Sequence, residues 1–70
     1  MKIFLSNHAK YRSTERGVDI SMIKEVIKNP LKINVQSEGQ KRVEGMIKGR
    51  KTIVVYQEKV KEKFVIITVI

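Results

Sequence analysis

The spacing of hydrophobic residues along the chain changes near Pro30. Before Pro30, apolar residues recur at helical spacing and form one stripe: Val18, Met22, Ile23, Val26 and Ile27. Asp19 is placed to cap this segment, and Asn29 precedes the proline, a position that disfavours helical backbone. The pattern predicts an amphipathic helix over about residues 19–29 whose apolar face covers a core.

An earlier helix is predicted over about residues 7–17, and it is of a different kind. Ser6 or Asn7 is placed to accept a hydrogen bond from the first-turn amides, and Gly17 suits the left-handed residue that ends a helix. Only two residues inside this helix are apolar, so it lacks the stripe that normally attaches a helix to a core. Other contacts must therefore hold it.

Charged side chains share one face of this first helix. His8, Arg12 and Arg16 recur every four residues, and Glu15 lies three residues after Arg12. Two interpretations remain open. The face is either a structural Arg–Glu network against the sheet or an exposed basic and imidazole surface directed at phosphates.

After Pro30 the period changes to two, which is typical of strands. Four strands are predicted, over about residues 31–36, 40–48, 51–57 and 63–70. Residues 1–5 alternate weakly and are too few to assign as more than a candidate edge strand. The expected fold is an α+β domain over residues 1–70, with two N-terminal helices packed on one face of a four-stranded antiparallel β-meander.

The last strand is expected to form the centre of the core through Val65, Ile67 and Val69, which would face the helices. Thr68 would then face the opposite side. Because the last strand runs antiparallel to its predecessor, Thr68 is expected beside Lys51 and Thr52. Gly45, inside the second strand, suggests a bulge or a close backbone approach.

The charge balance points to a polyanionic partner. The net charge is +8 with a pI near 10.1, which favours nucleic acid over a membrane surface or an acidic protein. A heavily solvated, thermophile-like surface without any such partner also fits these numbers. With no cysteine and no apolar run long enough to span a membrane, the sequence predicts a cytoplasmic protein without membrane association.

Residue types in the chain suit metal-independent phosphodiester cleavage. This reaction needs a base to deprotonate the 2′-OH and an acid for the leaving oxygen, and His8 is the only imidazole. Lys48, Arg50 and Lys51 cluster at one predicted turn and would bind phosphate, while Tyr56 is a weaker candidate for stacking a base. The sequence has no metal-ligand motif, so no metal or cofactor is expected.

A family resemblance rests on three stretches. Residues 8–18 read HAKYRSTERGV, residues 29–30 read NP, and residues 65–70 read VIITVI. They resemble the pattern of a family of small bacterial and archaeal domains of unknown function. That family is similar in fold to the barnase/EndoU/colicin/RelE group of metal-independent ribonucleases, many of which are toxins of toxin–antitoxin pairs.

The resemblance implies an endoribonuclease of toxin type that cleaves RNA by attack of the 2′-OH. The implied catalytic positions are His8, Arg12, Arg16 and Thr68. An acidic antitoxin protein is an implied partner, and the edge strand 31–36 is a candidate contact for a partner or a second copy. The alternative function is a non-catalytic basic module that binds nucleic acid or a protein partner.

Overall fold

The computed structural model describes all 70 residues and contains two helices and one five-stranded sheet. The strand order is β1-β5-β4-β3-β2; β1 runs parallel to β5, and the other neighbours are antiparallel. In chain order the elements are β1 (Lys2–Leu5), α1 (Asn7–Arg16), α2 (Ile20–Lys28), β2 (Lys32–Val35), a short 3₁₀ turn η1 (Ser37–Gly39), β3 (Gln40–Ile47), β4 (Arg50–Val60) and β5 (Lys63–Val69).

The structure is α+β with two helices, but the predicted four-stranded antiparallel meander is wrong. Residues 2–5 form a fifth strand, which pairs in parallel with the last strand and places Phe4 opposite Val65. Parallel neighbours need a long crossover connection, here the entire intervening chain. Such a pairing between the two ends of the sequence leaves no local signal, whereas the antiparallel hairpins do.

Side-chain caps set where each helix begins. Ser6 Oγ accepts a hydrogen bond from the Ala9 amide at 3.0 Å and donates one to the Ile67 carbonyl at 3.1 Å, so the α1 cap is also tied to β5. Asp19 caps α2 by accepting from the Met22 amide at 2.9 Å. Neither helix combines the length and the apolar character that crossing a membrane would require.

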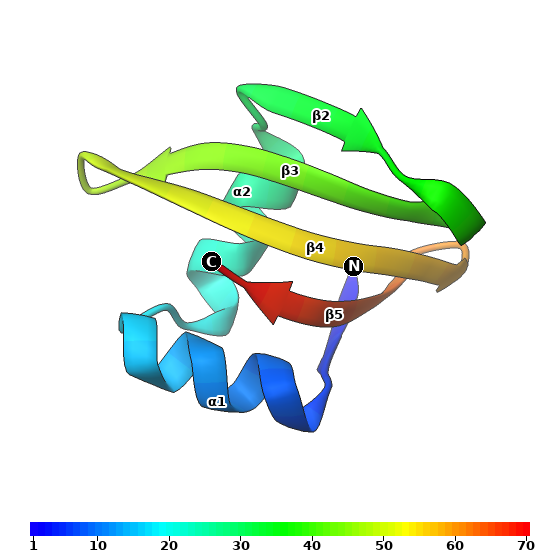
Figure 1. Cartoon of the computed structure of the whole chain (residues 1–70), viewed down its shortest axis with the longest axis horizontal. Helices are drawn as coiled ribbons and strands as arrows, with labels where there is room; N and C mark the ends of the chain where they lie inside the picture. The colour runs from blue at the N-terminus through cyan, green and yellow to red at the C-terminus, as the bar shows by residue number, and fades with distance from the viewer.

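Both helices pack on the sheet, and they divide it between them. The helix α1 lies along β5 and touches β1, whereas α2 crosses β3 and β4 (Figure 1). The helix α2 approaches the sheet closely at Gly45 on β3, where an added Cβ would lie 3.3 Å from the methyl groups of Val26. The predicted close backbone approach at Gly45 is therefore confirmed.

A bulge in β5 changes which of its side chains face the helices. Val69 is fully buried as predicted, but the other core residues of this strand are Phe64 and Ile66, whereas Val65 and Ile67 are only half-buried. Between the pairs Thr68–Val55 and Ile66–Tyr56, β5 has one extra residue, Ile67. An extra residue inverts the alternation of side chains along a strand. The prediction that Val65 and Ile67 centre the core is thus wrong.

Thr68 also lies away from its expected place, because β4 extends to Val60 and pairs with Lys63 across a two-residue turn, which shifts the register of β5. Thr68 pairs with Val55 rather than lying beside Lys51 and Thr52. The residue that returns to the β3–β4 turn is Ile70, whose amide donates to the Ile53 carbonyl at 2.8 Å. Since Val54 and Val69 are a neighbouring pair in the core, Thr68 and Val55 face the side of the sheet without helices.

Candidate nucleic-acid interface

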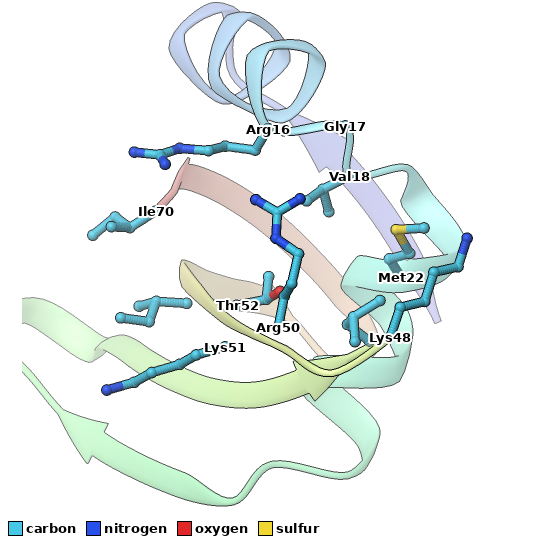
Figure 2. Close-up of a pocket in the computed structure, with 11 residues that line it drawn as sticks. Arg16, Gly17, Val18, Met22, Lys48, Arg50, Lys51, Thr52 and Ile70 are labelled. Atoms are coloured by element: carbon cyan, nitrogen blue, oxygen red, sulfur yellow. The ribbon is translucent and has the colours of Figure 1, made fainter.

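A cleft of about 280 Å³ opens at one end of the molecule, where the α1–α2 elbow meets the β3–β4 hairpin and the end of β5. Figure 2 shows Arg50 extending from the hairpin toward the elbow, with Arg16 above it and Lys51 pointing away. Four cationic residues and several apolar ones line this cleft: Arg16, Gly17, Val18, Met22, Ile47, Lys48, Arg50, Lys51, Thr52, Ile53 and Ile70.

The hairpin side of the cleft is set by a two-residue turn. Lys48 and Gly49 both have positive φ, 52° and 78°, which is the combination of a type I′ turn. This turn matches the twist of the flanking strands. It therefore places Lys48 at the tip and Arg50 and Lys51 on the first residues of β4, all at the cleft.

The elbow side depends on Gly17. Its φ is 68° and its amide donates to the carbonyls of Ser13 and Thr14, while the Val18 amide donates to the Ser13 carbonyl at 2.8 Å. Such bonds satisfy the last carbonyls of a helix and turn the chain sharply. As a result Arg16, the last residue of α1, and Val18 both border the cleft.

The four cations of the cleft differ in how far carboxylates neutralise them. Arg16 and Arg50 are exposed and form no ion pair. Lys51 Nζ lies 2.9 Å from Glu44 Oε1, and the positive charge of Lys48 acts on the carboxylate of Asp19. The two arginines are therefore the strongest positions in the cleft for an added anion.

Both carboxylates near the cleft are held in the ionised form. The hydrogen bond from Lys51, and to a lesser extent the nearby charges of Lys51, Lys32 and Arg42, lower the pKa of Glu44. The hydroxyl of Ser21, 2.6 Å from Asp19 Oδ1, and the Met22 amide lower the pKa of Asp19. Glu44 thus holds Lys51 in place, and the two carboxylates leave less net attraction for an anion at the lysines than at the arginines.

Arg12 joins α1 to the end of β5. Its Nε donates to the Val69 carbonyl at 3.4 Å, and its Nη1 lies 3.5 Å from the Glu15 carboxylate. The Tyr11 hydroxyl also donates to Glu15, at 3.5 Å. Of the two interpretations of the charged helix face, the structural network thus applies to Arg12, whereas Arg16 is open to a ligand.

His8 lies outside the cleft. It is exposed in the first turn of α1, and its imidazole forms no hydrogen bond with the rest of the protein. Eight residues separate it from Arg16, which at the helical rise is about 12 Å along the axis. A proton-transfer group must lie within about 3 Å of its proton or act through one water. His8 therefore cannot act on a phosphate held at the elbow.

Thr68 and Tyr56 also lie away from the cleft. Thr68 faces the side of the sheet without helices. Tyr56 is buried, with its ring 5.2 Å from that of Phe64 at an angle of 85°, and burial raises the pKa of its hydroxyl. With only 6% of its surface exposed, Tyr56 offers no ring face to a nucleobase.

Four of the eight predicted site residues thus meet in one place. They are Arg16, Lys48, Arg50 and Lys51. Sequence reasoning missed Glu44, the buried carboxylate that fixes Lys51 and also lies 3.6 Å from Arg42. A signal for it existed, because counting back from a two-residue turn places Glu44 and Lys51 on the same face of the hairpin.

The chain belongs to a protein family described as a domain of unknown function (DUF4258), whose model matches residues 5–70. The match includes both helices and the strands β2–β5, and therefore every residue of the cleft. No curated protein and no solved structure matches the chain.

Proposed function

We propose that this protein binds RNA and holds its phosphate backbone in the cleft between the helical elbow and the β3–β4 hairpin. One observation carries the proposal: Arg16 and Arg50, brought together from separate segments of the chain, border the same cleft without a carboxylate partner. Guanidinium groups bind phosphate through paired, charge-assisted hydrogen bonds. The net charge of +8 adds long-range attraction for a polyanion.

The dimensions and walls of the cleft favour a single strand. A volume of about 280 Å³ is at the lower limit of ordinary ligand pockets, so the cleft accommodates about one nucleotide of a longer chain. Val18, Met22 and Ile70 provide apolar wall that a sugar or base edge can contact. Specific RNA recognition is directed mostly at unpaired nucleotides, whose bases are available for such contacts.

Fluorescence anisotropy with a labelled single-stranded RNA tests the binding site. We expect Arg50→Gln and Arg16→Gln each to weaken binding about tenfold, the usual loss for a hydrogen bond to a charged group. Each should also reduce the slope of log K against log salt by about 0.7. Lys59→Gln is the matched control, because it removes the same charge from an exposed residue that does not border the cleft. If the control weakens binding as much as Arg50→Gln, the RNA is held by net charge and not by the cleft.

A second candidate function is metal-independent RNA cleavage by a toxin-like endoribonuclease. It is supported by the resemblance to that ribonuclease group and by the exposure of His8 on the same helix as Arg12 and Arg16. In the reaction a base removes the 2′-OH proton and the 2′-oxygen bonds to phosphorus. The P–O5′ bond breaks, and an acid protonates the departing oxygen, leaving a cyclic phosphate and a 5′-hydroxyl. Such a protein would act on RNA in the cytoplasm, with an acidic antitoxin able to cover the cleft.

The position of His8 constrains this second candidate. Because it lies about 12 Å from Arg16 along α1, His8 would serve a phosphate further along the bound strand. Incubation of RNA with the protein in EDTA tests this. Cleavage that survives chelation and is lost in both His8→Ala and Arg50→Gln supports the enzyme. Salt-sensitive binding without any cleavage supports the non-catalytic module alone.

A further inference from the structure

The outermost strand, β2, presents an uncovered apolar surface. Three side chains that share one face form this surface, which we call the β2 strip: Leu31, Ile33 and Val35, with 72%, 53% and 73% of their area exposed. Ile33 pairs with Val43, a fully buried core residue of β3, so the strip continues the helix-facing side of the sheet. It is therefore an extension of the core surface that no helix covers.

The two edges of the sheet differ in this respect. At the opposite edge, Ile3 and Leu5 of β1 pack against the core, and α1 lies over that side (Figure 1). At the β2 edge, α2 packs mainly on β3 and β4 and leaves the β2 strip exposed. The outer side of β2 has no strand neighbour, so its backbone groups on that side are available for pairing.

We propose that β2 is a homodimer interface, at which β2 of a second copy pairs antiparallel with it. With Ile33 of the two copies opposite one another, Leu31 faces Val35 of the second copy, and every member of the strip meets an apolar residue. Lys32 then faces Asn34, so no lysine faces a lysine. Like charges directly opposite destabilise a strand pair, and apolar cross-strand pairs stabilise it. The strip is thus self-complementary in this register.

The composition of β2 favours a second copy over another occupant. Natural edge strands usually block such pairing with several charges, an internal proline or a bulge, and β2 contains only Lys32. A single lysine on β2 would attract an acidic strand only weakly, whereas the three exposed apolar side chains favour an apolar partner strand. The two-fold axis of an antiparallel pair keeps the helices of both copies on the same side. No cleft residue lies on β2, so RNA binding and dimerisation are separable.

Sedimentation equilibrium over a concentration series tests the dimer. We expect a monomer–dimer equilibrium that strengthens as salt rises, because salt screens the repulsion between two copies of charge +8. Ile33→Lys places two lysines opposite one another and should leave only monomer where the wild type is half dimeric. Phe4→Lys is the control, because it adds the same charge to a 51% exposed residue on the other edge strand, and it should leave the dimer intact.

The register is tested by a gain of affinity. In Asn34→Glu, the new carboxylate of each copy would lie opposite Lys32 of the other copy. These two opposite-charge pairs should tighten the dimer about two- to thirtyfold. A wild-type chain that stays monomeric at every concentration and salt overturns the proposal. So does a dimer lost in Phe4→Lys, or one that Asn34→Glu leaves unchanged.

Discussion

The contact between α2 and β3 predicts that Gly45→Ala destabilises the protein, although alanine is ordinarily the better residue inside a strand. The added Cβ would lie 3.3 Å from both γ carbons of Val26 and 3.4 Å from its Cα. These contacts are tighter than ordinary van der Waals contacts, and the Val26 methyl groups that would have to shift by a few tenths of an ångström lie in the packed core. Overpacking of this kind costs about 1–3 kcal/mol of folding stability. Roughly 0.5–1 kcal/mol of this cost is offset, because alanine loses less backbone entropy on folding than glycine does.

The expected net loss is thus at most about 2.5 kcal/mol and centred near 1 kcal/mol, and a loss of about 1 kcal/mol lowers the Tm of a domain of this size by roughly 4–8 °C. Thermal and urea unfolding followed by circular dichroism measure it, and a double-mutant cycle with Val26→Ala assigns its cause. Val26→Ala removes both contacting methyl groups, so in that background Gly45→Ala should be neutral or stabilising. If Gly45→Ala raises the Tm of the wild type, or if the two losses simply add, the close packing of α2 on β3 is refuted.

Two further predictions concern the core and the charged side of the hairpin. Ile66→Ala should lower the free energy of unfolding in urea by about 2–5 kcal/mol, because Ile66 is fully buried. Ile67→Ala, at the bulge, should cost far less, and equal losses would contradict the bulge. Glu44 has a folded-state pKa below its ordinary value of 4.5, so the stability it contributes is present above that pH and is lost as the pH falls through the folded pKa. Glu44→Gln should therefore flatten the acid side of a stability–pH curve, and an unchanged acid side would show that its ion pairs are not formed.

Local patterns were sufficient to predict the two helices and the β3–β4 hairpin. The cap of α2 at Asp19 and the glycine end of α1 at Gly17 both depend on side chains within a few residues. The turn at Lys48 and Gly49 likewise has its own sequence signal. These features need no knowledge of distant contacts, and for this reason the two cationic sides of the cleft could be inferred from sequence.

Features that depend on distant contacts could not be predicted in this way. The parallel partner of β1 is β5, at the other end of the chain, and nothing in residues 2–5 specifies it. The bulge at Ile67 interrupts an apolar run in which both faces are hydrophobic, so the change of alternation leaves no trace in the pattern.

The charged face of α1 shows why a shared periodicity does not define a shared site. His8, Arg12 and Arg16 lie on one side of the helix, yet they occupy its beginning, middle and end. Only the end meets the hairpin, so Arg16 borders the cleft, Arg12 bonds to the Val69 carbonyl, and His8 stays in solvent. Arg16 is the last residue of α1, just before Gly17, and Arg50 is the first residue of β4, just after Gly49. Hydrogen bonds fix the backbone of the turn at Gly17, and the type I′ geometry fixes that of the turn at Gly49. Because these turns already fix the positions from which both arginines extend, the proposed phosphate binding would require ordering of the two side chains and no rearrangement of the backbone, which would reduce the entropic cost of association.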